Sequence, residues 1–529
     1  MYRVAICDSI SEKGIEILKN DPEIEPVIKT DVKKDELPHH LEDVDAIITR
    51  SATTIDKAFL SHCKRLKVIG RAGVGVDNID LDEASKRGIV VLNMPTGNTL
   101  AATEHTMTHM LNCLRFFPNA NYELKHKHIW DRKKWMGIEL NGKTVGIIGM
   151  GRIGTRVAIR VMSFGANVIV YDPYIKKEKA INIGANIVDD LDELIKNSDI
   201  ITIHTPKTEE TYNMIGEKEI EKMKDGVILI NCARGGLYNE EALYKGLKSG
   251  KIRALGIDVF ENEPQPNHPL YEFDNVFVTP HLGANTYESQ IRVAEGIARS
   301  VIDALKGRGY ENAVNIAMPE EEVSEIGKQF LGLAERMGSF LSQYVKSFIN
   351  RVTVYTHGEI EHYNSSLALF TSVGILKHMV DEHINYVNAP YVAKERGLNV
   401  EAKIYKGSTE FKNFMLIKAE YDDAKSIEIA GTIFEPNKAR IVNMNGFEME
   451  IELTGNIIVF QNIDKPGVIG QVGAILGKHN INIADFRLGR KEKSKEALSF
   501  IKTDEEVTDE ILTELLGIDG AIAAARVKL

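Results

Sequence analysis

Cysteine is scarce in this sequence. The 529 residues include four cysteines, which lie far apart and form no C-x-x-C pair. This pattern is typical of isolated thiols in a reducing compartment, and it argues against a disulfide framework or a cysteine-based zinc site. We therefore expect a cytoplasmic protein without a metal site. The four are Cys7, Cys63, Cys113 and Cys232.

Long apolar runs and basic blocks are also missing. No stretch approaches the roughly 20 apolar residues of a transmembrane helix, and residues 2–8 read as a strand rather than as a signal peptide. The net charge is −11 and the isoelectric point about 5.8, which disfavours nucleic acid as the main partner. The sequence therefore predicts a soluble protein that binds neither membranes nor nucleic acid.

What is present is an alternation of short apolar strands with amphipathic helices, in a chain long enough for several domains. Before residue 97 the pattern predicts strands at 4–7, 45–50, 66–70 and 88–93 and a helix at 12–20, the rhythm of an α/β sandwich. A long helical pattern at 288–306 follows the central repeats. We expect it to return the chain to the first sandwich, so that this domain consists of two separate pieces.

A glycine-rich turn at 149–154 is the strongest motif. The apolar run 145–148 predicts a buried parallel strand that leads directly into it. Gly149 allows the tight turn, Gly151 lets a pyrophosphate approach the backbone, and Gly154 lets helix and strand pack closely. The free N–H groups at the start of the next helix then favour phosphate charge. The motif alone is weak evidence, because glycine turns also close ordinary βα units.

The context of the turn strengthens the prediction of a dinucleotide site. A helical pattern follows, with Val157, Val161 and Phe164 on one face, and then a strand at 167–171 that ends in Asp172. Asp172 lies 23 positions beyond Gly149, near the spacing of an acid that binds a ribose diol. Its negative charge would repel a 2′-phosphate, so NAD is expected rather than NADP.

Three polar side chains follow later strands of the same predicted sheet. Arg234 comes after the strand at 226–231, Glu263 after the strand at 255–258, and His281 after the strand at 275–278. Each alone has an ordinary explanation, as a surface ion pair, a solvated acid or a structural histidine. Together they fall at the carboxyl ends of strands, where ligands bind in such sheets. Oxidation of an alcohol by a nicotinamide needs such a base, and a cation to hold a carboxylate.

These residues carry a resemblance to the D-2-hydroxyacid dehydrogenase family, and over its whole length the chain resembles the long members that oxidise 3-phospho-D-glycerate. The resemblance implies that His281 is the base, that Glu263 holds its imidazole, and that Arg234 binds the substrate carboxylate. It rests on the segments Gly70–Asn78, Gly149–Gly154, Asn231–Gly236, Asp258–Pro264 and Pro280–Thr286.

The resemblance also implies the remaining ligand contacts. Arg132 would reach the substrate phosphate from a neighbouring subunit of a dimer or tetramer. The expected substrate-binding residues are Arg50, Arg71, Val74, Gly75, Asn98, Arg132 and Arg234. The expected NAD-binding residues are Gly149, Gly151, Arg152, Ile153, Gly154, Asp172, His204, Thr205, Pro206, Ala233, Asp258, His281 and Gly283.

The last segment predicts β-α-β-β-α-β, the ferredoxin-like order: strands at 456–461, 481–488, 496–502 and 521–527, helices at 468–478 and 508–516. Asn462–Gly470 and Ile481–Ala484 resemble an ACT domain, a small-molecule sensor. The resemblance implies L-serine as effector, held by Asp464 and Asn482. Some relatives have an aromatic residue where this chain has Asn462, and a purely dimerising role is the alternative.

The predicted architecture is a Rossmann-type doubly wound NAD domain inserted in a flavodoxin-like substrate domain, followed by an α+β intervening domain and a ferredoxin-like ACT domain. The expected reaction opens serine biosynthesis. Other possibilities are a glyoxylate or hydroxypyruvate reductase of the same superfamily, a nucleotide-sensing binding protein, and a C-terminal third that serves assembly. The expected boundaries are 1–97 with 286–312, 98–285, 313–452 and 453–529.

Overall fold

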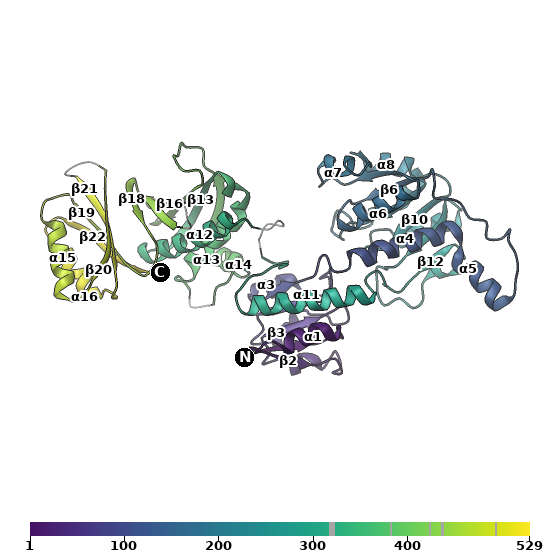
Figure 1. Cartoon of the computed structure of the whole chain (residues 1–529), viewed down its shortest axis with the longest axis horizontal. Coiled ribbons are helices and arrows are strands. Elements are labelled where there is room, and N and C mark those ends of the chain that lie inside the picture. Colours follow the sequence, from purple (N-terminus) through teal and green to yellow (C-terminus); the bar gives the residue numbers. More distant parts are fainter. Residues whose placement is uncertain (317–322, 381–382, 423–424, 435–437, 492–494) are drawn as a thin grey trace. The chain divides into compact units, whose positions relative to one another are not determined.

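The computed structural model describes residues 1–316, 323–380, 383–422, 425–434, 438–491 and 495–529. The chain divides into two compact units, one of residues 1–54, 68–78 and 92–312, the other of residues 55–67, 79–91 and 313–529. Each is described by itself below (Figure 1). No helix in the described part of the chain combines the length and the apolar character of a membrane span.

The first sheet has the strand order β2-β1-β3-β4-β5, which is the flavodoxin-like 2-1-3-4-5 order. Strand β1 pairs in parallel with β2 and β3, and β3 with β4. The strands are β1 (Tyr2–Ile6), β2 (Ile24–Ile28), β3 (Ala46–Thr49), β4 (Val68–Arg71) and β5 (Val90–Leu92). The helices along this part are α1 (Glu12–Lys19), α2 (Lys57–His62) and α3 (Leu81–Lys86).

The second sheet has the order β12-β11-β10-β9-β6-β7-β8, and its strands pair in parallel. The order reverses between β6 and β9, which is the switch point where doubly wound sheets bind ligands. The strands are β6 (Thr144–Ile148), β7 (Asn167–Tyr171), β8 (Asn186–Val188), β9 (Ile200–Ile203), β10 (Val227–Asn231), β11 (Ile252–Ile257) and β12 (Val276–Val278).

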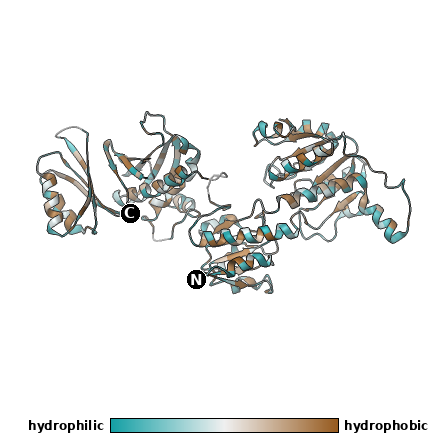
Figure 2. Ribbon diagram, in the orientation of Figure 1, coloured by the Kyte–Doolittle hydropathy of each residue, from teal (hydrophilic) through white to brown (hydrophobic). Residues whose placement is uncertain are grey.

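Helices cover this sheet, and their apolar faces turn inward while their outer faces are polar (Figure 2). In α6, Val157 and Val161 are buried as expected. The helix ends at Ser163, and Phe164 at its C-cap is 49% exposed. The helices in this part of the chain are α4 (Thr99–Arg115), α5 (Phe117–Tyr122), α6 (Arg152–Ser163), α7 (Lys177–Ile181), α8 (Leu191–Asn197), α9 (Glu217–Lys222) and α10 (Glu240–Lys248). Figure 1 shows α5 apart from the sheet, and no residue of α5 is buried.

Helix α11 (Tyr287–Leu305) brings the chain back to the first sheet, where it packs against α1 and β4. The approach to α1 is close: a Cβ added at Gly14 would lie 2.6 Å from the carbonyl oxygen of Ala294. This is the return of the chain that the helical pattern suggests. The domain boundaries themselves stay a prediction.

The intervening region holds a mixed sheet of order β14-β13-β15-β16-β17-β18 with a helical pair beside it. Strands β15 to β18 form antiparallel pairs, whereas β13 and β14 are parallel. The strands are β13 (Ile349–His357), β14 (Asn399–Ile404), β15 (Phe414–Tyr421), β16 (Lys425–Phe434), β17 (Lys438–Met444) and β18 (Phe447–Ile451). The helices are α12 (Glu325–Tyr344), α13 (Asn364–Leu376) and α14 (Ala389–Arg396).

The last sheet has the antiparallel order β20-β21-β19-β22, which is the ferredoxin-like arrangement. The predicted element order is confirmed, and α15 has the predicted bounds. Strand β20 begins two residues later than expected. The elements are β19 (Asn456–Ile463), α15 (Val468–Lys478), β20 (Ile483–Arg490), β21 (Glu496–Thr503), α16 (Asp509–Leu516) and β22 (Ala521–Lys528).

The crossing of α12 and α13 depends on glycine. A Cβ at Gly374 would collide with the backbone oxygen of Glu335, whereas a Cβ at Gly332 would meet nothing within 4 Å. We expect Gly374→Ala to destabilise the C-terminal unit by about 1–3 kcal/mol, because backbone atoms cannot rotate away. Gly332→Ala is the matched control and should stabilise the helix by up to about 1 kcal/mol. Calorimetric unfolding measures the stability of both variants. Equal changes in stability would contradict the close contact between α12 and α13 at Gly374.

Candidate active site

The glycine turn has the backbone that a dinucleotide needs. Gly149 has a φ of 88°, in the left-handed region that favours glycine. A Cβ at Gly154 would collide with the carbonyl oxygen of Gly149, so this glycine allows the helix to pack on the turn. A Cβ at Gly151 would meet no protein atom within 4 Å. The space at Gly151 is therefore open to a ligand, beside the first N–H groups of α6.

Asp172 lies against this turn. Its carboxylate accepts hydrogen bonds from the backbone N–H of Met150 (2.7 Å) and of Tyr174 (3.0 Å). The end of β9 closes the other side, because His204 and Thr205 lie against Gly149. Burial lowers the pKa of His204 to about 4, so its imidazole is neutral. The donors, the open space and the acid fit NAD, whose ribose hydroxyls an aspartate can bind.

The other expected cofactor residues lie in the first turn of α6 and in the loops after β9, β10, β11 and β12. Arg152 and Ile153 form the first turn of α6, and Pro206 follows β9. The N–H of Ala233 donates to Asn231 at the end of β10. Gly283 donates to the carboxylate of Asp258 at the end of β11.

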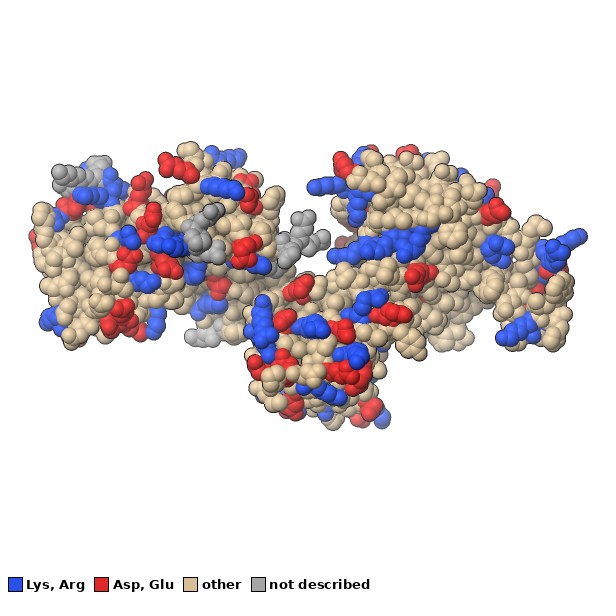
Figure 3. Space-filling model, viewed as in Figure 1, with Lys and Arg blue, Asp and Glu red and all other residues tan. Residues whose placement is uncertain are grey.

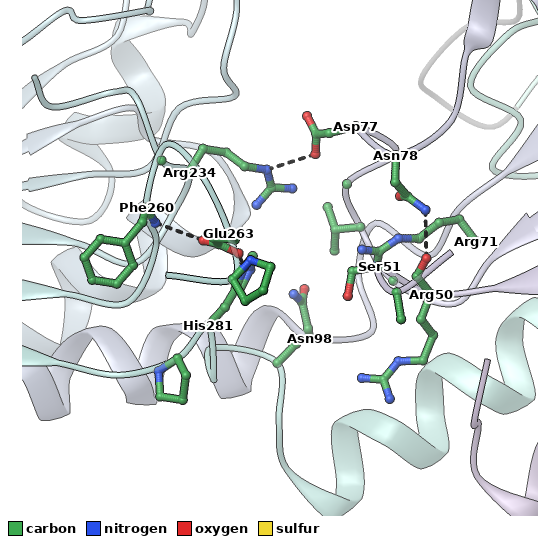
Figure 4. Close-up of a pocket in the computed structure, with 18 of the residues that line it drawn as sticks. Arg50, Ser51, Arg71, Asp77, Asn78, Asn98, Arg234, Phe260, Glu263 and His281 are labelled. Carbon is green, nitrogen blue, oxygen red and sulfur yellow. Dashed lines mark hydrogen bonds and ion pairs between the residues drawn. The ribbon is translucent and has the colours of Figure 1, made fainter. Parts of the chain in front are cut away.

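A large pocket lies next to these segments within the first unit (Figure 4). Its volume is about 1200 Å³. Arg234, Glu263 and His281 lie on one side, and Arg50, Arg71 and Asp77 face them from the other. The residues expected to bind substrate or to catalyse that line the pocket are Arg50, Arg71, Val74, Gly75, Asn98, Arg234, Glu263 and His281.

His281 and Glu263 form a hydrogen-bonded pair. Nδ1 of His281 lies 2.7 Å from Oε2 of Glu263, and Oε1 accepts the N–H of Phe260 at 2.9 Å. Partial burial raises the pKa of Glu263, but the hydrogen bonds from His281 and Phe260 outweigh it, so the net pKa is lowered. Because a carboxylate only accepts, Nδ1 carries a proton, and in the neutral imidazole Nε2 has the lone pair. His281 therefore has the tautomer of a base.

Arginines make the pocket suitable for anions. Burial, together with the positive charges of Arg234 and Arg50, lowers the pKa of Arg71 to about 10. Within the described residues, Nε of Arg71 is buried without a hydrogen-bond partner. Arg234 lies 3.4 Å from Asp77 through Nε and donates to the carbonyl of Ala233. An anion here would relieve the repulsion among the guanidinium groups and supply the missing acceptor.

Sequence reasoning missed several pocket residues. Asp77 pairs with Arg234, and the amide of Asn78 donates to the carbonyls of Arg50 and Thr53. Lys207 and Gln290 also line the pocket. Asp77 and Asn78 stand in the segment that carries the family resemblance, so this segment was the available signal. The other two stand in no motif.

Arg132 lies outside this set of lining residues. It stands beside Asp131, in the turns after the π-helical segment η2 (Glu123–Lys127), and Lys134 and Trp135 there bind the carboxylate of Glu123. Its expected role from a second subunit stays a prediction.

Charged side chains of both signs are interspersed over most of the face shown in Figure 3.

One group among the described residues has the composition of a metal site. The ligand atoms of His105, His109 and Cys232 lie within 4.8 Å of one another. However, Nε2 of both histidines is engaged by the hydroxyl of Thr279, at 3.0 and 2.8 Å. These contacts make the group part of a hydrogen-bond network, which is taken up below.

Of the effector residues expected in the last sheet, Asp464 and Asn482 lie in loops, and Asn462 lies near the end of β19. Asp464 pairs with Arg490 at 3.1 Å, and the amide of Asn482 donates to Asp504 at 2.6 Å. Asn462 is buried, and its amide donates to the carbonyl of Ile463. Binding of an effector there stays a prediction.

The turn, the acid and the base pair define a class, the NAD-dependent dehydrogenases of D-2-hydroxy acids. Residues 107–283 match the D-isomer specific 2-hydroxyacid dehydrogenase NAD binding domain. Among solved structures, the chain is similar to D-lactate dehydrogenase from Aquifex aeolicus complexed with NAD and lactic acid (31% identity, TM-score 0.52), covering 60% of this chain and all of that one. It is also similar to the TT0316 protein from Thermus thermophilus (33% identity, TM-score 0.54). This match covers 59% of this chain and 99% of that one.

Full-length relatives narrow the class. The chain is 40% identical to D-3-phosphoglycerate dehydrogenase of Archaeoglobus fulgidus over 100% of both chains, and 38% identical to that of Bacillus subtilis, again over 100% of both. Residues 327–445 match the D-3-phosphoglycerate dehydrogenase intervening domain and residues 456–520 the ACT domain. The chain therefore belongs to the D-3-phosphoglycerate dehydrogenase family, and it is an NAD-dependent oxidoreductase. The predicted fold and the family resemblance are confirmed.

Gly151 gives a test of the cofactor site that spares the fold. Because an added Cβ meets no protein atom, we expect Gly151→Ala to keep the melting temperature of the wild type. The methyl group would fill the space of the pyrophosphate and weaken NADH binding at least about tenfold. Fluorescence titration with NADH measures this. Unchanged affinity would place the dinucleotide elsewhere.

Proposed function

We propose that the protein oxidises 3-phospho-D-glycerate to 3-phosphohydroxypyruvate with NAD, the first step of the phosphorylated route to L-serine. One observation supports a phosphorylated substrate: three arginines line the pocket that contains His281 and Glu263, and among the described residues the buried Nε atom of Arg71 has no hydrogen-bond partner. A 2-hydroxy acid with an uncharged side chain needs one cation, for its carboxylate. A phosphorylated 2-hydroxy acid needs further cations, because its phosphate is also charged.

The residues divide the work as follows. Arg234 holds the substrate carboxylate through its planar fork, and Arg50 and Arg71 bind the phosphate. His281 takes the hydroxyl proton at Nε2, while Glu263 stabilises the imidazolium through Nδ1. The glycine turn and Asp172 would hold NAD, which would supply the acceptor for the hydride of C2. Asn98, Val74 and Gly75 complete the wall of the pocket.

The ACT domain supports regulation by a small molecule, and we propose L-serine, bound near Asp464 and Asn482, as the effector. An end product of the route would then reduce its own synthesis. We further propose that the protein works in the cytoplasm as a dimer or tetramer, in which Arg132 of one copy reaches the pocket of another. The domain boundaries given by the sequence are part of the same proposal.

Substrate choice is tested by Arg50→Gln. With 3-phosphoglycerate and NAD, we expect kcat/KM to fall roughly 10–100-fold, the worth of a hydrogen bond to a charged group. With unphosphorylated glycerate, wild type and variant should be equally slow. Arg160→Gln, on the exposed face of α6, is the control. If wild type prefers the unphosphorylated substrate, it is a hydroxyacid reductase of another kind.

The same assay with added L-serine tests regulation. We expect L-serine to lower the rate of the wild type, and an unchanged rate would reject L-serine as the effector.

The base pair is tested by Glu263→Gln. The side-chain oxygen can still accept the N–H of Phe260, but the amide nitrogen then faces Nδ1 of His281. This favours the tautomer with its proton on Nε2, which cannot act as a base. We expect kcat to fall by about 10³–10⁴-fold, as in related pairs. NADH affinity should persist. A loss below tenfold would reject the assignment.

A further inference from the structure

The carboxylate of Asp258, at the end of β11, is fully buried and bound on every side. Oδ1 accepts hydrogen bonds from the hydroxyl of Thr279 (2.6 Å) and the N–H of Leu282 (2.7 Å), and Oδ2 accepts the N–H of Gly283 (2.8 Å). Burial alone raises the pKa of Asp258. Hydrogen bonds from His105, Thr279 and Leu282 outweigh this effect and lower it, so the group is an anion.

Hydrogen bonds to Asp258 hold the backbone at His281. The N–H of His281 donates to the carbonyl of Asp258 at 2.9 Å, and the next two N–H groups in the chain donate to its carboxylate. Between them, His281 has a φ of 54°, in the left-handed region that a residue with a side chain rarely adopts. Surrounding contacts must hold such a conformation. Asp258 supplies three of them.

Two histidines of α4 hold Asp258 in turn. Nε2 of His105 lies 3.0 Å from the hydroxyl oxygen of Thr279 and 3.1 Å from Oδ1 of Asp258. Nε2 of His109 lies 2.8 Å from the same hydroxyl. The single proton of Thr279 goes to Asp258, because a carboxylate can only accept. Because Oδ1 of Asp258 can only accept, Nε2 of His105 also carries a proton, which faces both this carboxylate and the hydroxyl oxygen of Thr279. Nε2 of His109 lies 3.2 Å from Nε2 of His105 and completes the network.

We propose that His105 and Thr279 are positioning residues for the reaction. They fix the carboxylate of Asp258, which fixes the backbone of residues 281–283, and this backbone aims the imidazole of His281 at Glu263 and the pocket. His105 is absent from the pocket lining and acts through Thr279 and Asp258. This inference rests on the proposed role of His281 as the base.

The test is His105→Leu, which removes the donor from a site outside the pocket. We expect kcat with saturating 3-phosphoglycerate and NAD to fall roughly 100-fold, because a base displaced by about 1 Å costs that much. KM for 3-phosphoglycerate should stay within twofold. The dissociation constant of NADH should change far less than kcat, because the glycine turn and Asp172 lie outside this network. His105→Gln keeps an N–H near Nε2 and should recover most of the rate. His126→Leu, on an exposed segment, is the control.

Thr279→Val gives a second, isosteric route if the leucine variant folds poorly, and it should show the same loss of kcat. The proposal is overturned if every folded variant among His105→Leu and Thr279→Val keeps the kcat of the wild type. It is also overturned if KM and NADH affinity change as much as kcat, or if His105→Gln is as slow as His105→Leu. His281→Ala separates the two levels. If it retains turnover, the proposed base is wrong; if it loses turnover while His105→Leu does not, only the positioning role fails.

Discussion

The arrangement of the pocket depends on the 2.7 Å hydrogen bond between His281 and Glu263. It fixes which imidazole nitrogen has a lone pair, and it needs both partners held at the mouth of the same pocket. The doubly wound sheet makes this possible, because parallel strands end at one edge and their following loops converge. His281, Glu263 and Arg234 stand in the loops after β12, β11 and β10, respectively.

Much of this arrangement was readable in the sequence, because it depends on short-range pattern. The turn from Gly149 to Gly154 joins a strand to a helix within a few residues, and the apolar runs mark the strand ends that carry Arg234 and His281. In the last sheet, α15 begins at Val468 as expected. Side chains at strand ends are brought together by topology, so a correct strand order is enough to predict their proximity.

What the sequence did not reveal depends on tertiary contacts. Strand β2 contains Pro26 and lies at the edge of its sheet, where a missing N–H is tolerated, so its pattern is weak. Asp77 becomes part of the site only because Arg234 faces it across the pocket. His105 lies on a helix more than 150 residues from Asp258 in the chain, and no local period connects them.

The crowding of like charges around Arg71 also affects how the protein responds to its surroundings. Because this cavity gathers guanidinium groups, we expect compact dianions such as inorganic phosphate and sulfate to compete with the proposed substrate for the same donors. Such ions also screen the field that draws substrate in, over a Debye length of roughly 8 Å at physiological ionic strength. Turnover therefore depends on the anion composition of the medium as well as on substrate concentration.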